Sequence, residues 1–368
     1  MKYKIFIAAI VMFFFLRTHA TIRTVCNYPV NVAQYNDIQS AINASGNGDT
    51  ILVQGSPVTY EPAIVDDKRL TLIGPGWSPV RLVSPLTAKV KRITINGIPS
   101  SGTEIQGFVF TEGSYYGIIT EQNQPVNDIR VIRNYFLGIG FSVSDGFGNG
   151  NGTTCKGYVV EGNYFETATF YIEVNNKFEN SVIQNNIFYN SVMIGFQLCN
   201  AVLVNHNLFY RNGINGSSTA FEACENLTIQ NNIFSRSDPG GVNITSNCYF
   251  RNNLTYNTST IAAWTINGNG DDGGNILNQN HQMADQVIIN STAGGANPLL
   301  DFTIATGPAN NSASDGKDMG LLFDATGSLN WTYSRNSRLP YVYKVSIANN
   351  TIEPNATLNV SLEARKTN

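Results

Sequence analysis

The chain repeats a short motif in which two polar residues are followed by two large apolar ones. "NNIF" stands at residues 185–188 and again at 231–234, and the looser copy "NHNLF" stands between them at 205–209. The residues that close the repeat are Phe136, Phe165, Phe188, Phe209 and Phe234, with Phe110 one step earlier and Thr255 one step later. These steps are 21 to 29 residues long. A unit of this size cannot bury an apolar face alone, so it must stack on copies of itself.

Within each unit, apolar residues alternate with mixed ones. A large apolar residue stands five places before each closing position, in the series Ile105, Val131, Val160, Ile183, Val204, Ile229 and Phe250. A second mostly apolar series lies two places further back, and the residues between the two series are mixed. Alternation of period two predicts short strands with one buried face. We therefore predict an all-β fold, a parallel β-solenoid of ten to twelve coils from near residue 50 to near residue 305, with coils about 4.8 Å apart.

Stacking places like residues on like residues. The Phe series should fill the core. The Asn residues two places earlier should form a ladder of mutually hydrogen-bonded amides, and they are Asn134, Asn163, Asn186, Asn207, Asn232 and Asn253. Asn also tolerates the bend at which a strand turns. We interpret His206 as a substitute for a ladder Asn in this corner and not as a catalytic base.

The two ends of the chain differ from the repeat. Lys2 and Lys4 precede an apolar run at 5–16 and small residues at 18–20, which predicts a signal peptide at 1–20 that is cleaved after Ala20; a retained anchor is the alternative. No later apolar run is long enough to span a bilayer. We expect a mature chain without a membrane span that is secreted, periplasmic or at the cell surface. Alternating stretches at 341–347 and 357–364 predict that residues 324–368 form a β-hairpin tail on the last coils, or else a sorting module.

Composition limits the classes of partner. The net charge is −3 and only 13% of residues are charged, so the chain lacks the basic footprint of a nucleic-acid-binding protein. A monomer is expected. Five cysteines without a C-x-x-C pair argue against zinc and thioredoxin-like sites. Cys199 and Cys224 occupy equivalent places in adjacent coils, where either a disulfide or stacked free thiols would fit.

Three further stretches carry a family resemblance. They are "DIQSAINASGNGDTILVQGSPVTY" at 37–60, with an amphipathic helix at 38–44 and a first strand at 50–53, "KRLTLIGPG" at 68–76 and "GPANNSASDGKDMGLLF" at 307–323. Together with the Phe-spaced coils they resemble right-handed parallel β-helix proteins of the pectate-lyase-like kind, over roughly residues 36–323. The resemblance implies one β-helix domain over residues 21–323, a right-handed coil whose first end is capped by the helix, and a polysaccharide as substrate or ligand.

In enzymes of this kind the site lies on an outward sheet face flanked by long turns. Alignment of "FSV", "IEV", "FQL", "FEA" and "VNI" gives an outward polar column, composed of Ser142, Glu173, Gln197, Glu222 and Asn243. Glu173 and Glu222, two coils apart, would be about 9–10 Å from each other, a spacing that suits inverting hydrolysis. Gln197 and Asn243 would bind sugar. The alternative is an ordinary solvated sheet face.

Two arginines follow the closing Phe by two residues in adjacent coils, Arg211 and Arg236. They would hold an anionic substrate or else lie in solvated turns. Asp271 and Asp272, in the Gly-rich loop 267–275, suit Ca²⁺ but match no defined calcium loop, so no metal or cofactor is assigned.

The catalytic motifs of related enzymes are missing. The Gly-His-Gly and Arg-x-Lys strings of polygalacturonase-like enzymes do not occur, and neither does the basic pair of alginate or chondroitin lyases of this fold. Two hypotheses remain, namely a secreted polysaccharide hydrolase or lyase and a non-catalytic glycan-binding or structural surface protein.

Overall fold

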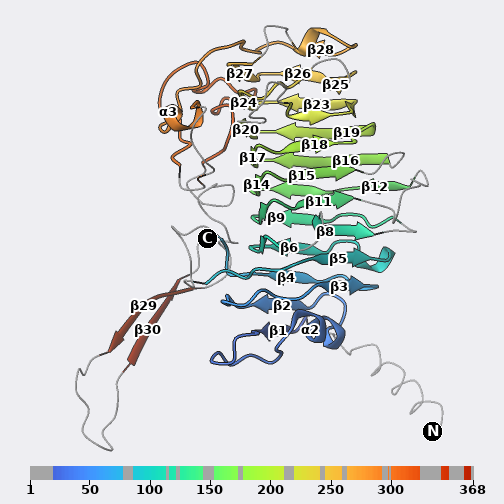
Figure 1. Cartoon of the computed structure of the whole chain (residues 1–368), viewed down its shortest axis with the longest axis vertical. Coiled ribbons are helices and arrows are strands. Elements are labelled where there is room, and N and C mark those ends of the chain that lie inside the picture. Colours follow the sequence, from blue (N-terminus) through green and yellow to red (C-terminus); the bar gives the residue numbers. More distant parts are fainter. Residues whose placement is uncertain are drawn as a thin grey trace, which may run out of the picture.

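The computed structural model describes residues 20–77, 86–112, 116–121, 125–143, 153–172, 177–210, 219–240, 245–258, 263–291, 297, 300–323, 341–347 and 360–365. Over these residues the protein is a parallel β-solenoid of about eight turns (Figure 1). The predicted fold class is confirmed. The number of turns is below the ten to twelve predicted. The chain leaves the stack after residue 279, before the predicted end near residue 305, and runs back along its side (Figure 1). The hand of the coil stays a prediction.

Three parallel sheets form the sides of the coil. The long sheet consists, in order, of β1 (Ile22–Val25), β2 (Thr50–Val53), β4 (Thr71–Ile73), β6 (Glu104–Gln106), β9 (Arg130–Ile132), β13 (Val159–Glu161), β16 (Lys177–Gln184), β19 (Leu198–Asn205), β23 (Leu227–Gln230), β26 (Tyr249–Arg251) and β28 (Gly270–Asp271). β12 (Thr154–Lys156) also pairs with β16.

The other two sheets have seven strands each. The Phe sheet consists of β7 (Val109–Phe110), β10 (Tyr135–Leu137), β14 (Tyr164–Glu166), β17 (Ile187–Tyr189), β20 (Leu208–Tyr210), β24 (Ile233–Ser235) and β27 (Leu254–Tyr256). The third sheet consists of β3 (Ala63–Asp66), β5 (Ile93–Asn96), β8 (Tyr116–Glu121), β11 (Gly140–Val143), β15 (Thr169–Ile172), β18 (Val192–Ile194) and β21 (Phe221–Glu222). Smaller elements are the β22–β25 pair (Cys224–Glu225, Thr245–Ser246) and the 3₁₀ turns η1 (Ile98–Ser100) and η2 (Ala263–Thr265).

The Phe residues that close each repeat stack in one buried column. All six rings from Phe110 to Phe234 are fully buried. Centroids of successive rings lie 4.6 to 5.1 Å apart, and the ring planes are inclined by 1° to 14°. On the long sheet Ile183 pairs with Val204, as predicted. Since offset-stacked rings add to the free energy of area burial, the column stabilises every neighbouring pair of coils that it joins.

The predicted Asn ladder is present. The donors of the ladder run from Asn134 to Asn253, and the acceptors run from Asn163 to Asn275. Each acceptor Oδ1 receives hydrogen bonds from both the backbone N–H and the Nδ2 of the Asn one coil earlier. Each Nδ2 also donates to a backbone carbonyl of the preceding coil, as Asn207 does to Ile183. The ladder therefore satisfies buried backbone donors at a corner where the sheet pattern is interrupted.

The residue before each ladder Asn has a different role. Asn185, His206, Asn231 and Asn252 have φ between 48° and 59°, the left-handed region that Asn enters more readily than most residues. This corner position turns the chain between the long sheet and the Phe sheet. His206 thus replaces the turning Asn and not a ladder Asn, which corrects the sequence interpretation.

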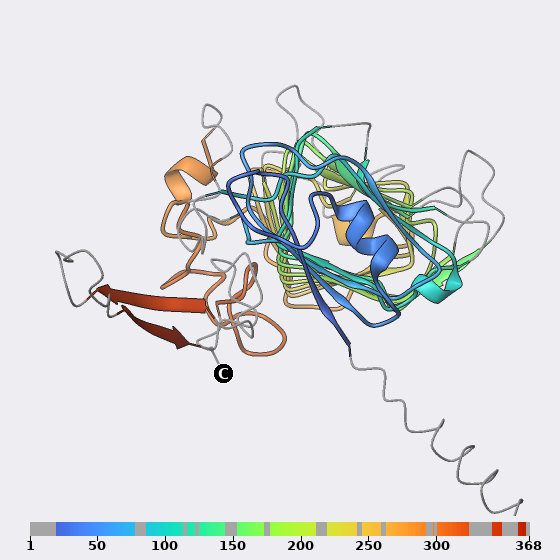
Figure 2. The same ribbon diagram turned by 90° about the horizontal axis from the view of Figure 1, so that it is seen from below.

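Helix α2 (Ile38–Ala44) has the bounds that the sequence predicts. Asp37 caps it by accepting from the Ser40 N–H at 2.7 Å, and Ile38, Ala41 and Ile42 join the main core. Figure 2 shows the helix lying over the end of the coil. Its capping role stays a prediction. Within the described ranges, neither α2 nor α3 (Gln286–Ile289), nor any other helix, has the length and apolarity that crossing a membrane requires.

The solenoid starts earlier than expected. β1 pairs in parallel with β2 over four residues, from Ile22 with Thr50 to Val25 with Val53. The first strand thus precedes α2, and the predicted start near residue 50 is wrong. β1 is four residues long and precedes the repeat, so periodicity could not reveal it.

The C-terminal hairpin is present, with β29 (Tyr341–Ile347) antiparallel to β30 (Val360–Arg365). In Figure 1 it stands apart from β26 and β28, so the expected packing of the tail on the last coils finds no support. The predicted signal peptide lies almost wholly outside the described residues.

Replacement of Asn207 by Ala removes the oxygen that accepts from two donors of Asn186. A buried donor without a partner costs about 1–3 kcal/mol, so we expect a loss of at least about 2 kcal/mol in the free energy of unfolding, measured by urea denaturation. Asn200→Ala, at an exposed position on β19, is the matched control and should change stability by less than about 0.5 kcal/mol. Equal stability of the two variants would contradict a structural ladder.

Candidate functional site

The outward face of the third sheet is the surface on which the sequence places the candidate site. Its central row follows from the strand registers: Ile64, Thr94, Ile119, Ser142, Tyr171, Ile194 and Glu222. The neighbouring residues Phe141, Phe170, Met193 and Phe221 point inward and are fully buried. The row thus combines apolar, aromatic and polar groups, with one exposed carboxylate at Glu222.

This register corrects the predicted polar column. Glu222 pairs with Ile194 one coil earlier, and Ile194 pairs with Tyr171. Tyr171 therefore lies two coils from Glu222 on this row, and Gln197 lies outside the row. Among the described residues, Ser142 and Glu222 are the members of the predicted column that share a row.

The error came from choosing the register of strands that are only two to four residues long. Several apolar residues follow one another around 170–172 and 192–196, so alternation alone allows more than one register. A signal in the sequence does select the correct one, because Phe141, Phe170 and Met193 each lie five residues after the closing Phe of their coil. Counting from the Phe column would have placed Tyr171 and Ile194 outward.

The remaining predicted site residues are dispersed. Gln197 is half-buried in the turn after β18, and its backbone N–H donates to the Gly195 carbonyl at 2.8 Å. Arg236 is half-buried at the corner that follows β24 and has φ 58°. It belongs to the coil after the one that contains Glu222. Glu173, Arg211 and Asn243 lie outside the described residues, so their roles stay predictions.

An aromatic pair that the sequence reasoning missed lies on this face. The rings of Tyr116 and Tyr171 are stacked, with centroids 6.0 Å apart and planes inclined by 9°, and both side chains are half-buried. Gly140 pairs with Tyr116 in the register, and a Cβ at this position would meet the Thr169 carbonyl oxygen at 1.9 Å, so the close approach of β11 and β15 requires glycine.

Ser142 adds a hydroxyl to the same row. The residue is 1% exposed, and its Oγ has no hydrogen-bond partner within the described part of the chain. A buried polar group without a partner is costly. This hydroxyl is therefore able to accept or donate a hydrogen bond to a group that reaches the row beside Tyr171.

A second acid in an unusual environment lies on the outer face of the long sheet. Burial raises the pKa of Glu161, against the effect of a hydrogen bond from Gln184 and of the nearby Arg133 and Arg130. Arg130 itself pairs with Glu104 at 3.0 Å. Because these charges compensate one another, the group behaves as a structural ion-pair cluster.

No metal centre emerges from the described part of the chain, where no group of three or more His, Cys, Asp or Glu residues could hold an ion. Asp271, which the sequence offers as a calcium ligand, instead accepts from the Gly273 N–H at 2.9 Å and from Asn275 Nδ2 at 2.7 Å. Its carboxylate closes a turn at the end of the Asn ladder.

All five cysteines are buried free thiols, which is one of the two alternatives left open for Cys199 and Cys224. Burial raises the pKa of both thiols, and raises that of Cys248 to about 11. Since the thiolate is the nucleophile, none of these three residues is suited to covalent catalysis.

The chain matches no protein-family model, and a search of curated proteins finds no match.

The free thiols can be counted in solution. We expect a thiol-specific disulfide reagent to label almost no cysteine in the native protein at neutral pH, because the side chains are buried. In guanidinium chloride without reductant it should label all five. Labelling of only three in the unfolded protein would show that two cysteines form a disulfide.

Proposed function

We propose that this protein is an exported, polysaccharide-binding β-helix of the pectate-lyase-like kind, with a right-handed coil and a cleaved leader at 1–20. Its glycan-binding surface is the outward face of the third sheet around Tyr171. The observation that carries the proposal is the stacked pair Tyr116–Tyr171 on a partly open sheet face. The same row supplies the exposed Glu222 carboxylate as a polar group.

The chemistry of this row suits a sugar chain. Ligand sites combine apolar and aromatic surface with a few polar groups that orient the ligand. A Tyr ring offers a rigid flat face at a low cost in conformational entropy. The parallel strands repeat about every 4.8 Å along the solenoid axis, so a polymer lying along that axis meets Tyr171, Ile194 and Glu222 in succession.

Binding without catalysis is favoured over hydrolysis. Hydrolysis by the usual mechanism needs two carboxyl groups about 5–9.5 Å apart, and the register neighbours of Glu222 on its row are Ile194 and, beyond it, Tyr171. Glu173, which the sequence analysis pairs with Glu222, lies outside the described residues, so this pairing stays a prediction. A carbohydrate-active hydrolase or lyase remains the second candidate, since Glu222 is exposed on the face that the proposal uses.

The binding proposal is tested by comparing the wild type with Tyr171→Ala. Affinity electrophoresis and calorimetry measure the binding of each protein to a panel of neutral and acidic polysaccharides. Loss of one aromatic contact is worth about 0.5–1.5 kcal/mol, so we expect binding to weaken by at least about threefold. Tyr249→Ala is the matched control, because Tyr249 is an exposed aromatic residue on the long sheet. Unchanged binding by Tyr171→Ala, or an equal loss in both variants, contradicts the proposed surface.

The catalytic alternative is tested on any polysaccharide that binds. Reducing ends and unsaturated uronates are measured for the wild type and for Glu222→Gln, which keeps the size of the side chain and removes its charge. We expect no turnover above background in either protein. Turnover by the wild type that falls at least about a hundredfold in Glu222→Gln would establish an acid–base role.

A further inference from the structure

After the last coil the chain returns along the outside of the Phe sheet. This return segment comprises residues 280–323 and carries α3 (Figure 1). Its apolar residues Met283, Ile289, Phe302 and Met319 are buried in a second hydrophobic cluster. On the solenoid side the cluster includes the outward residues of successive Phe-sheet strands, Tyr164, Ile187, Leu208, Ile233 and Leu254. The segment thus covers a face that would otherwise expose a row of apolar side chains.

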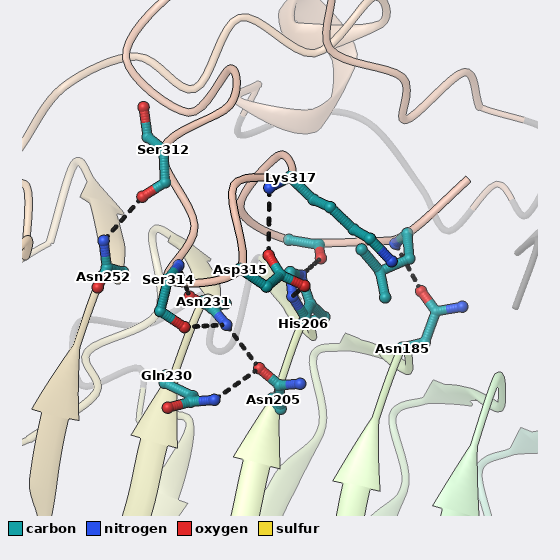
Figure 3. Close-up of polar contacts among 12 residues, drawn as sticks. Asn185, Asn205, His206, Gln230, Asn231, Asn252, Ser312, Ser314, Asp315 and Lys317 are labelled. Carbon is teal, nitrogen blue, oxygen red and sulfur yellow. Dashed lines mark hydrogen bonds and ion pairs between the residues drawn. The ribbon is translucent and has the colours of Figure 1, made fainter. Parts of the chain in front are cut away.

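The far end of the segment is held at the corner positions of the solenoid, as Figure 3 shows. Asn231 Nδ2 donates to Ser314 Oγ at 3.0 Å, and Asn231 Oδ1 accepts from the Ser314 N–H at 2.7 Å. Asn252 donates to the Ser312 carbonyl, and Asn185 accepts from the Leu322 N–H, both at 2.8 Å. Corner residues from successive coils therefore bind one stretch of chain.

His206 occupies the same corner series and also contacts the segment (Figure 3). Its Nδ1 lies 3.0 Å from the Gly320 carbonyl oxygen, to which it must donate, and its Nε2 lies 3.3 Å from Asp315 Oδ2. The ring is 1% exposed, whereas the Asp315 side chain is 42% exposed. Burial lowers the pKa of His206. Asp315 and the contact with the Gly320 carbonyl oppose this shift, whereas Lys317 adds to it.

His281 lies at the start of the segment and is fully buried. Its Nδ1 accepts from the Met283 N–H at 3.1 Å, while its Nε2 donates to Asn290 Oδ1 at 2.9 Å. Its ring also meets Tyr256 of β27 edge-on, at 6.1 Å between centroids. Because one ring nitrogen must accept a hydrogen bond, this geometry requires the neutral imidazole. Burial lowers the pKa of His281 to about 4, against the Asn290 contact.

The chain contains three histidines. His19 lies in the predicted leader, and the other two hold the two ends of the return segment in buried positions. We propose that the return segment is an acid-sensitive strap, which the neutral ring of His281 keeps docked and which protonation of that ring releases from the Phe sheet. Both ring nitrogens of His206 face acceptors, so its contacts are compatible with either charge state. Release would uncover the apolar row and create a new hydrophobic surface on the solenoid.

The direction follows from linkage. A histidine whose pKa is lower in the docked state than in the free state stabilises docking fully above its free value, near 6.5. That contribution is lost as the pH falls toward the docked value, about 4 for His281. Asp315 attracts a protonated His206 and weakens its response. The pKa of His281 is shifted only by burial and by the uncharged Asn290 side chain, so no neighbouring charge weakens the response of His281 to acid.

The test is hydrogen exchange with mass spectrometry on the full chain at pH 7.5 and 4.5, corrected for the intrinsic exchange rates. In the wild type we expect the opening equilibrium of peptides within 280–323 to rise at least about tenfold at pH 4.5, while peptides of β13, β16 and β19 stay protected. The variant is His206→Asn with His281→Gln, which is neutral at both pH values. Asn suits position 206 because the adjacent coils use Asn185 and Asn231 there with the same positive φ.

In the double variant the protection of the segment should be the same at both pH values, even where its absolute level is lower. His281→Gln alone serves as the second variant if the double variant does not fold, and it should show a smaller acid response than the wild type. Equal protection of the wild-type segment at pH 7.5 and 4.5 overturns the proposal. So does an undiminished acid response in the variants, which would assign the release to carboxylates such as Asp315.

Discussion

Every feature of this protein depends on one constraint, that each coil must lie in register on the coil below it. The backbone hydrogen bonds of the parallel sheets hold the coils about 4.8 Å apart. The Asn ladder fixes which residues of adjacent coils lie opposite each other, because a shift of one residue would break its amide–amide and amide–backbone hydrogen bonds together. With the register held, the rings from Phe110 to Phe234 stack face to face. Burial of aromatic area and satisfaction of buried amides thus act on the same alignment.

The two residues of the Asn-Asn pair have different structural roles at the corner. The second residue faces inward and joins the ladder, as Asn186 and Asn207 do. The first residue has positive φ and faces the return segment, as Asn185 and Asn231 do. A side chain that turns the backbone therefore also binds a distant part of the chain. This arrangement explains how a histidine at the corner, His206, comes to contact Asp315 and Gly320.

The candidate site depends on the same register. On the third sheet, a shift of two residues in the assumed register places Tyr171 where the sequence alignment places Glu173. The proposed glycan-binding surface rests on this register, because the register sets Ile194 and Tyr171 beside the exposed Glu222.

The sequence by itself determined the solenoid, the Phe column, the Asn ladder, helix α2 and the terminal hairpin, because each has a local or periodic signal. Spacing of 21 to 29 residues, alternation of period two and a helix with its Asp37 cap are properties of neighbouring residues. Alternation alone left the register of the third sheet open, since strands of two to four apolar residues allow several alignments, and the constant distance of five residues from the closing Phe to Phe141, Phe170 and Met193 selects one. Only the tertiary structure decided the places of β1 and of the return segment. Their partners lie far away in the chain, and the free energy that places them comes from the apolar row of the Phe sheet and from corner groups such as His206, which no local pattern connects to residues 312–322.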